Sequence, residues 1–416
     1  MLKDSYIKKN KKKYILILKK RKFKNKNIIK KIFNLYKKQK NYIKLLEKYN
    51  KQINKYSKDY FKNKKNKKKY KNILNIKNKK KILKNKLLII KENILNIKLK
   101  LPNIINELYF KKYKNIKNNK TIYKYKKYNL LLKKNKLLSH IELAKKYELF
   151  DTNTASKISG TGFVIYSGLG LKLYNSLVKY LLFINKKKGY KEYKLPYLVN
   201  EQSIYGTGQY PEKKNQLYNI SKDNLFLIPT GEVPLINLYK NKIFKKINLP
   251  IKAQTYSNCF RREAGSYGKN VKGLNRLHQF GKVEIIEITE NKKSNLRLFK
   301  MLEHIKNVLK KLKLYFRIRL LSCNNIGFTS SITYDFEVYS FGQKKWIEVS
   351  SLSNCLEYQS NNLKIYYLNK KNKELCHTLN GSCISIPRLL LTIIEMYQTK
   401  NKIKIPKVLK KYYKNE

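Results

Sequence analysis

Residues 260–266 read Phe-Arg-Arg-Glu-Ala-Gly-Ser and residues 276–280 read Arg-Leu-His-Gln-Phe, with Glu284 a short distance beyond them. The whole chain contains only eight arginines, and three of them fall within these two stretches. Arginine carries a planar fork that binds a phosphate or a carboxylate bidentately and stacks on flat rings, whereas lysine offers only a point charge. Because the chain otherwise uses lysine almost everywhere, the segment predicts a site for an anionic nucleotide and, through its glutamates, for an ammonium-bearing substrate.

The net charge has two competing explanations. The 416 residues carry a formal charge of +72, which is typical of proteins that bind nucleic acids. Lysine, asparagine, isoleucine, tyrosine and leucine dominate, however, and only four alanines occur, as an AT-rich bacterial genome would encode. We assign the larger part of the charge to this codon bias. The excess still predicts nucleic-acid binding that weakens steeply with salt, because each neutralised phosphate releases counterions.

The cysteines and the apolar runs predict the cellular compartment of the protein. The five cysteines show no CxxC spacing, which predicts reduced thiols in a cytoplasmic protein rather than disulfides or zinc ligands. No apolar run approaches the roughly 20 residues of a membrane span. The basic N-terminus lacks the apolar core and cleavage site of an export signal, so neither export nor a membrane partner is expected.

The first 159 residues are predicted to be mostly helical. They contain no glycine and a single proline, Pro102, and the absence of both residues favours long helices. Apolar residues recur in a 4-3 alternation through two runs, at about 28–60 and 68–98, which predicts an antiparallel coiled coil. The seam positions are Ile28, Ile32, Leu35, Tyr42, Leu46, Tyr49, Ile53 and Tyr56, with Gln39 in the polar gap, and then Ile73, Ile76, Leu83, Leu87, Ile90, Ile94 and Ile97, with Lys80 in the gap.

This coiled coil predicts a basic helical arm. The charged stretch from Lys58 to Lys71 forms its tip, and two helices of about 30 residues give an arm about 45 Å long. Pro102 ends the second helix. The alternative is a solvated helical hairpin without a role. We therefore divide the chain into an N-terminal arm (1–112), a connector without assigned structure (113–139) and a second domain (140–416).

The second domain is predicted to be α+β. Gly-containing turns separate short apolar segments, and strands and helices mix without regular βαβ alternation, which favours an antiparallel sheet. Neither a GxxxxGK(S/T) nor a GxGxxG motif occurs, so a P-loop or Rossmann nucleotide site is disfavoured. The expected strands include 224–229, 282–288, 333–338 and 346–350, and the expected helices are 171–185, 296–312 and 388–398.

Four further motifs accompany the arginine-containing stretches at 260–266 and 276–280. They are Thr230-Gly231-Glu232-Val233-Pro234, Glu348-Val349-Ser350-Ser351, Leu379-Asn380-Gly381-Ser382 and Pro387-Arg388. In this order the motifs resemble those of class II aminoacyl-tRNA synthetases, and of the seryl type in particular, closely over residues 140–408 and by architecture over 1–110. The resemblance implies a tRNA-binding coiled-coil arm and a catalytic domain built on an antiparallel β-sheet flanked by helices.

The resemblance also implies roles for individual residues, with ATP as substrate and Mg²⁺ as cofactor. Arg261 would hold the α-phosphate and the serine carboxylate, Arg276 the γ-phosphate, and Glu263 the adenine amino group. Arg388 and Phe280 would sandwich the adenine ring. The ATP-binding set is Arg261, Arg262, Glu263, Arg276, Leu277, Phe280, Glu348, Val349, Ser350, Ser351 and Arg388, in which Arg261 and Arg388 are catalytic and Glu348 and Ser351 hold Mg²⁺.

The predicted serine site consists of Thr230, Gly231 and Glu232 around the ammonium group and Glu284 and Ser382 around the hydroxyl group. A site built to hydrogen-bond a hydroxyl rejects alanine, because its own buried polar groups would be left unpaired. Three departures from the family pattern stand out: Gly231 in place of a common alanine, which slightly loosens the backbone; Gly281 in place of a polar residue; and Asn361-Asn362 in place of arginine, which puts an arginine contact to substrate in doubt.

The function that the resemblance implies is the two-step attachment of L-serine to tRNA(Ser), and also to tRNA(Sec) as an open possibility, by a cytoplasmic homodimer that binds no DNA. Residues 189–200 stand where the family makes its dimer contact. Two alternatives remain. One is a synthetase-like paralogue that binds an amino acid or RNA without aminoacylation, against which the arm and all three motifs argue. The other is a general basic RNA-binding protein.

Overall fold

The computed structural model describes residues 1–25, 27–62, 67–111, 118–126, 137–210, 214–264, 272–370 and 372–414. The chain forms two compact units, one of residues 2–102 and one of Met1 with residues 103–416. Gly265 and Ser266 of the first motif, most of the predicted connector and part of the predicted arm tip lie outside the described residues.

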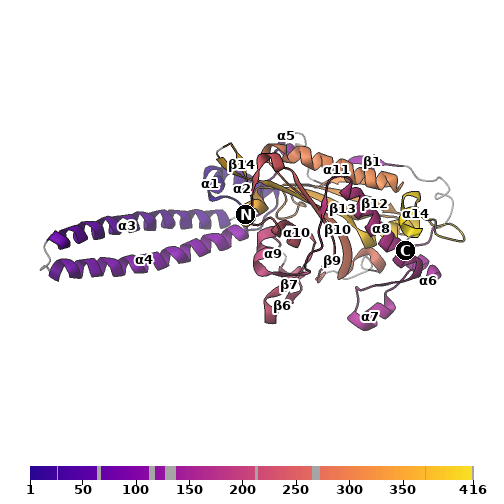
Figure 1. The fold of residues 1–416 in the computed structure, drawn as a ribbon, viewed down its shortest axis with the longest axis horizontal. Coiled ribbons are helices and arrows are strands. Elements are labelled where there is room, and N and C mark those ends of the chain that lie inside the picture. Colours follow the sequence, from indigo (N-terminus) through magenta and orange to yellow (C-terminus); the bar gives the residue numbers. More distant parts are fainter. Residues whose placement is uncertain are drawn as a thin grey trace. The chain divides into compact units, whose positions relative to one another are not determined.

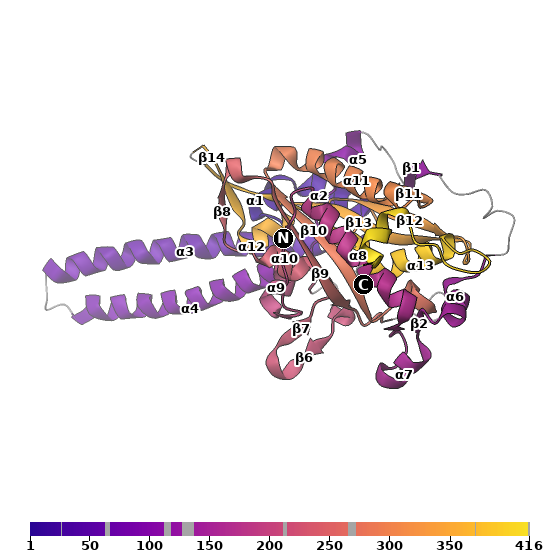
Figure 2. The same cartoon turned by 45° about the vertical axis from the view of Figure 1, so that its right-hand side comes forward.

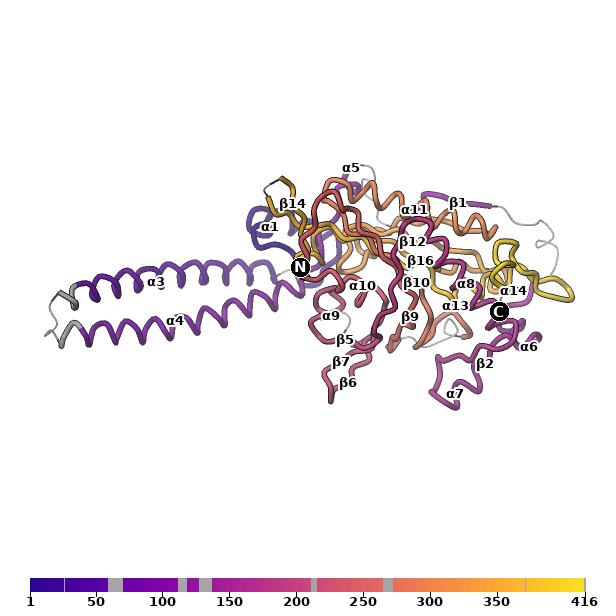
Figure 3. The backbone as a smooth tube through the Cα atoms, in the orientation of Figure 1, coloured from indigo at the N-terminus to yellow at the C-terminus, as the bar shows by residue number. Residues whose placement is uncertain are grey.

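The unit of residues 2–102 contains a long helical hairpin. Helices α3 (Ile28–Lys62) and α4 (Lys67–Leu99) lie side by side in antiparallel directions, as Figures 1 and 3 show. Every predicted seam position is buried or half-buried, including the polar Gln39 and Lys80. The helix bounds agree with the predicted 28–60 and 68–98 to within two residues. The 4-3 pattern therefore predicted both the helices and the faces along which they pack.

Two short helices that the sequence analysis did not predict precede the hairpin, α1 (Asp4–Lys9) and α2 (Lys11–Lys20). The Tyr36 hydroxyl of α3 donates to Asp4 Oδ1 at 2.9 Å, and Lys98 of α4 pairs with the same carboxylate at 2.5 Å. Tyr14, Ile17 and Leu18 are buried, at the i, i+3, i+4 spacing of an amphipathic helix. This spacing could have revealed α2, although the surrounding lysines obscure it.

The second unit is built on an eight-stranded sheet, seen in Figures 1 and 2. All neighbouring strands pair antiparallel except β4 and β9, which are parallel. The predicted α+β class is thereby confirmed. In sheet order the strands are β1 (Lys120–Tyr125), β11 (Phe316–Leu320), β12 (Ile332–Ser340), β13 (Lys345–Leu356), β16 (His377–Ser385), β10 (Gln279–Thr289), β9 (Ile251–Phe260) and β4 (Lys191–Glu192).

The predicted boundary between arm and catalytic unit needs correction. The second unit begins at Asn103, not after residue 112. The Asn103 side chain donates to the carbonyls of Thr329 and Cys355 at 2.8 and 2.7 Å, which joins this segment to the second unit. The connector predicted at 113–139 also contributes β1, the edge strand of the large sheet, and β1 pairs with β11.

Three helices, α8 (Gly168–Lys186), α11 (Ser294–Lys311) and α13 (Ile386–Met396), pack on one face of the sheet. On this face His304 of α11 hydrogen-bonds Asn185 of α8 at 2.6 Å, and the Cys383 thiol of β16 contacts the same amide at 3.5 Å. Side chains alternate between the faces of a strand. In β10, Val283 and Ile285 therefore face the helices, while Lys282 and Glu284 face the opposite side, where the candidate site lies.

Smaller elements complete the second unit. A cluster of buried residues from α10 (Glu232–Asn237) and α12 (Tyr358–Leu363), including Leu235, Ile236 and Leu363, packs against Ile286 and Ile288 of β10. The remaining elements are α5 (Glu107–Lys111), α6 (His140–Tyr147), β2 (Phe150–Asp151), α7 (Asn153–Ser159), β3 (Ile165–Tyr166), β5 (Leu198–Asn200), α9 (Glu201–Thr207), β6 (Asn219–Ile220), β7 (Leu225–Leu227), β8 (Ile243–Lys245), β14 (Tyr366–Asn369), β15 (Asn372–Leu375) and α14 (Lys410–Lys414). None of the described helices is long and apolar enough to cross a membrane.

The buried histidine between α8 and α11 gives a first prediction. Burial, aided by nearby lysines, lowers the pKa of His304 to about 4, against about 6.5 in the unfolded chain. Between these values only the unfolded chain binds the proton, so stability is fully present above pH 6.5 and is lost as the pH falls through 4. We expect this residue to account for about 3 kcal/mol of acid destabilisation. The free energy of unfolding, measured with denaturant between pH 7 and 4, should fall less steeply for His304→Gln than for wild type. Equal slopes for the two proteins would contradict the assignment.

Candidate active site

Two adjoining cavities open on the side of the sheet away from the three helices. The narrow cavity measures about 70 Å³ and the wide cavity about 650 Å³. The walls common to both consist of Arg261, Lys282, Glu348 and Ser382. Of the predicted site residues, Glu263, Arg276, Leu277, Phe280, Val349, Ser350 and Arg388 line only the narrow cavity, and Thr230, Glu232, Glu284 and Ser351 line only the wide one.

Two predicted residues line neither cavity. Arg262 follows Arg261 directly, but its side chain is exposed and its backbone N–H donates to the Gln216 carbonyl at 3.0 Å. Gly231 has an ordinary helical φ of −60°, a conformation that any residue can adopt. A Cβ at this position would lie 2.9 Å from both Ser257 Oγ and Thr255 Cγ2. Glycine therefore fits the local packing, behind the wall that Thr230 and Glu232 form.

Pairing of β9 with β10 positions Arg261. The arginine follows the last residue of β9, and its backbone N–H donates to the His278 carbonyl at 2.8 Å. Its Nε donates to the Pro229 carbonyl at 3.1 Å, and its guanidinium lies 5.2 Å from the centroid of the Phe280 ring. The Nε side of the guanidinium is thus held by a backbone carbonyl, while the rest of the group lies where the two cavities meet.

Glu263 and Arg276 were predicted to bind opposite ends of the nucleotide, yet they form an ion pair with each other. Glu263 also has a positive φ of 48°, which is uncommon outside glycine and clusters at functional sites. The narrow cavity holds no more than a handful of water molecules. A nucleotide that used both side chains as predicted would therefore have to separate this pair.

Arg388 lies in the first turn of α13 and is held at two points. Its Nε donates to the Asn275 carbonyl at 3.2 Å, and its Nη1 donates to the Glu348 carbonyl at 3.0 Å. The Glu348 carboxylate lies 3.9 Å from the guanidinium. The arginine therefore bridges the turn that precedes β10 and the strand β13, across the mouth of the narrow cavity.

A buried polar cluster, made up of Lys282, Glu284 and Thr230, forms one wall of the wide cavity. Lys282 pairs with Glu284 at 2.6 Å and donates to Thr230 Oγ1 at 2.7 Å, and that hydroxyl donates to Glu284 Oε2 at 3.1 Å. Lys282 and Glu284 are 4% and 2% exposed, so each charge depends on its partner. Ser382 stands directly opposite Glu284 in the pairing of β16 with β10.

Four residues at the site had no predicted role: Lys282, Gln359, Asn380 and Asp335. Gln359 and Asn380 both donate to the buried Glu232 carboxylate, Gln359 at 2.6 Å. Lys282 and Asn380 could have been found from the sequence, because they lie two positions before Glu284 and Ser382 and hence on the same face of a strand. The departures at Asn361 and Asn362 proved to be structural: their amides bond the carbonyls of Met1, Tyr205 and Gly206.

The glycine at position 281, which the resemblance did not explain, also has a structural reason. A Cβ there would lie 1.7 Å from the Tyr174 hydroxyl oxygen. That hydroxyl is 3.1 Å from the Tyr256 hydroxyl, and Tyr174 is buried. The two tyrosine hydroxyls occupy the space that a side chain at position 281 would need.

The donor set on β12 and β13 fits a magnesium ion. Glu348 and Ser351 line the wide cavity together with Asp335, which lies directly opposite Ser351 in the strand pairing. Asp335 is 8% exposed, and no described residue hydrogen-bonds its Oδ1. Burial and the nearby Glu348 raise the pKa of Asp335 to about 7. Two carboxylates and a hydroxyl are the hard oxygen ligands that Mg²⁺ prefers, and a cation would relieve both the orphaned oxygen and the repulsion.

The chain is similar in sequence to known proteins. Residues 217–397 match the tRNA synthetase class II core domain (G, H, P, S and T). The serine–tRNA ligase of Methylacidiphilum infernorum is 43% identical over 283 residues, which is 67% of this chain and 67% of that protein. The corresponding enzyme of Mesoplasma florum is 45% identical over 278 residues, which is 67% of this chain and 66% of that protein. The aligned segment therefore spans about two thirds of these curated relatives.

Solved structures extend the likeness to nearly the whole chain. Seryl-tRNA synthetase from Pyrococcus horikoshii, complexed with ATP, superposes with a TM-score of 0.92 at 25% identity over 100% of this chain and 98% of that one. The cytoplasmic serine–tRNA ligase from Naegleria fowleri, complexed with AMP, superposes with a TM-score of 0.84 at 24% identity over 97% and 94% of the two chains. The second match is a likeness of fold.

Proposed function

The chain belongs to the family of serine–tRNA ligases, to one of which it is 43% identical while covering 67% of that protein, and on this premise we propose that it attaches L-serine to tRNA(Ser). Serine and ATP first give seryl-adenylate and pyrophosphate, and the seryl group then moves to the 3′ end of the tRNA. The observation that carries the proposal is the common wall of the two cavities, because the two substrates of the first step must meet at one point.

In the first step a serine carboxylate oxygen bonds the α-phosphorus of ATP, and the bond from that phosphorus to the bridging oxygen breaks. The electron pair leaves with pyrophosphate. No protein base is required, because the carboxylate is ionised at neutral pH. Arg261 stands in the common wall, where it can neutralise both anions and hold them in line. Arg276 would reach the γ-phosphate after it separates from Glu263.

Glu348, Ser351 and Asp335 would hold Mg²⁺, which when bound supplies charge neutralisation for the phosphates. Arg388 and Phe280 would enclose the adenine, since cation–π contacts of this kind stabilise by about 1–2 kcal/mol when desolvated. Glu232, oriented by Gln359 and Asn380, would take the serine ammonium group. The family resemblance implies these roles, and the structure adds Asp335, Gln359 and Asn380 to them.

We further propose a cytoplasmic homodimer. Three large apolar side chains of α7, β3 and α8, those of Ile158, Ile165 and Leu171, are 73, 36 and 42% exposed. They belong to the same unit as residues 189–200, which the family resemblance assigns to the dimer contact. Burial against a second copy would remove this apolar surface from water. Sedimentation of the purified protein tests the proposal.

The serine site predicts strong selection for a hydroxyl. Alanine would leave Glu284 and Ser382 without the hydrogen bonds that serine makes, and sites of this kind discriminate by about 10⁴-fold or more. Serine-dependent ATP–pyrophosphate exchange should therefore exceed alanine-dependent exchange by that factor in kcat/KM. Equal exchange with the two amino acids would refute the assignment of Glu284 and Ser382.

The experiment that tests the whole proposal combines this exchange with charging of tRNA(Ser) transcripts. Both activities are expected. Exchange without charging would indicate an enzyme that activates serine for another acceptor, and charging of tRNA(Sec) in parallel tests the wider substrate range. The absence of serine-dependent exchange in the presence of Mg²⁺ would refute the function.

A further inference from the structure

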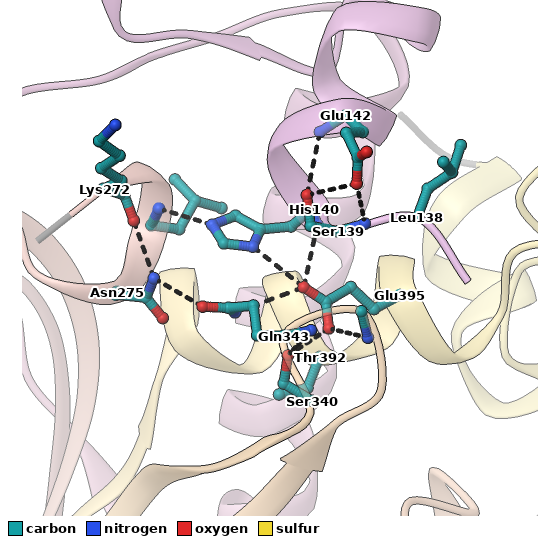
Figure 4. A network of polar contacts seen from close by, with 12 residues as sticks. Leu138, Ser139, His140, Glu142, Lys272, Asn275, Ser340, Gln343, Thr392 and Glu395 are labelled. Atoms are coloured by element: carbon teal, nitrogen blue, oxygen red, sulfur yellow. Dashed lines mark hydrogen bonds and ion pairs between the residues drawn. The ribbon is translucent and has the colours of Figure 1, made fainter. Parts of the chain in front are cut away.

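A buried carboxylate, Glu395, sits behind the narrow cavity without entering it. The residue lies on α13, two turns after Arg388, and is fully buried. Its Oε1 accepts from the backbone N–H of His140 at 2.9 Å, from His140 Nδ1 at 3.0 Å and from Gln343 Nε2 at 3.3 Å. Its Oε2 accepts from Ser340 Oγ and from the Gly342 N–H. Figure 4 shows these donors converging on the carboxylate.

The hydrogen bonds from these donors stabilise the charged form of the Glu395 carboxylate, which we call the anchor. Burial alone would raise its pKa, but the hydrogen bonds from His140 and Ser340 outweigh burial and hold the pKa below the usual value. The Nδ1 atom of His140 lies against the carboxylate, so it carries the proton, and Nε2 is left as an acceptor. The anchor thus fixes both the tautomer and the direction of the imidazole ring.

Two routes lead from the anchor to the turn at residues 272–275. Along the first, His140 Nε2 accepts from the Leu274 N–H at 3.2 Å. Along the second, Gln343 Oε1 accepts from Asn275 Nδ2 at 2.9 Å, and the same amide donates to the Lys272 carbonyl at 2.8 Å. Figure 4 shows the second route from Glu395 through Gln343 to Asn275 and Lys272.

The turn at residues 272–275, held by these hydrogen bonds, is part of the proposed nucleotide site. Leu274 and Asn275 line the narrow cavity, and the Asn275 carbonyl accepts from Arg388 Nε at 3.2 Å. A free arginine side chain has many rotamers, and ordering it costs up to about 2 kcal/mol. If the Asn275 carbonyl already holds Arg388 in the folded protein, part of this entropy cost is met during folding. Nucleotide binding then loses less free energy to ordering the arginine.

We propose that Glu395, Gln343 and Asn275 are positioning residues that hold Arg388 ready for the adenine of ATP. This inference rests on the proposed function of Arg388. None of the three needs to touch the reacting atoms, and Gln343 and Glu395 line neither cavity. Because the relay ends at the adenine side, its loss affects ATP and leaves serine binding unchanged.

The test uses Gln343→Met, which keeps the side-chain volume but removes both hydrogen bonds. We expect the KM for ATP in serine-dependent exchange to rise about tenfold and the KM for serine to stay within twofold. Asn275→Ala, which cuts the same link from its other end, should give the same defect. Gln202→Met is the matched control, because Gln202 is exposed, contacts Lys240 and lies outside both cavities.

A double variant separates positioning from general loosening. In an Arg388→Ala background, Gln343→Met should add nothing to the KM for ATP, because residues that act through one another are not additive. Additive effects, an equal rise in the KM for serine, or an unchanged KM for ATP would each overturn the inference. Wild-type enzyme without serine-dependent exchange would instead refute the proposed function.

Discussion

We expect Arg261→Ala to lower kcat/KM for serine-dependent ATP–pyrophosphate exchange by about 10³-fold, since removal of one preorganised donor to a developing charge costs 10²–10³-fold. Arg261 stands in the common wall of the two cavities, where the serine carboxylate and the α-phosphate would meet. Its bond to the Pro229 carbonyl and its contact with Phe280 hold it there. Without it, two anions would approach each other with less positive charge to offset their repulsion.

The neighbouring arginine supplies the matched control. Arg262 has the same charge and nearly the same place in the sequence, but its side chain is exposed and lines neither cavity. Arg262→Ala should therefore stay within a few-fold of wild type. Arg261→Lys should recover only part of the loss, because an ammonium cannot form the bidentate contact. A loss in Arg262→Ala as large as that in Arg261→Ala would contradict the placement of the site.

A shortened arm should abolish efficient charging of tRNA while sparing adenylate formation. The variant replaces residues 41–86 by a Gly-Ser turn and keeps the contacts of Asp4 with Tyr36 and Lys98 at the base of the hairpin. All residues proposed for adenylation lie in the unit that begins at Asn103, so exchange should be unchanged. Charging should fall by on the order of 10²-fold or more, because the phosphate contacts expected of the arm would be lost.

Charge and length can be separated in this experiment. A full-length arm with four exposed lysines changed to glutamine should charge tRNA less well and with a weaker dependence on salt, since fewer counterions are released on binding. The same number of exposed lysines changed elsewhere should have little effect. The arm set is Lys37, Lys44, Lys48 and Lys51, and the control set is Lys222, Lys242, Lys245 and Lys404. Wild-type charging by the shortened arm would mean that the basic hairpin reflects codon bias alone.

The helical hairpin was predictable to within two residues because its packing is local. A seam that repeats every 3.5 residues can be read from one helix at a time, and even Gln39 and Lys80 fall on the half-buried side. The end of the arm was not predictable in the same way. The second unit begins at Asn103 because that side chain bonds the carbonyls of Thr329 and Cys355, more than 200 positions away in the sequence.

The site shows the same division. The residue types available for nucleotide, serine and metal could be read from the sequence, because arginine forks, carboxylates and hydroxyls carry their chemistry wherever they are placed. Which of them share a wall depends on the three-dimensional fold. Pairing of β10 with β16 sets Glu284 opposite Ser382, pairing of β12 with β13 sets Asp335 opposite Ser351, and Gln343 reaches Asn275 across a turn. Register between strands far apart in the sequence depends on the packing of the whole sheet, and local periodicity carries no record of it.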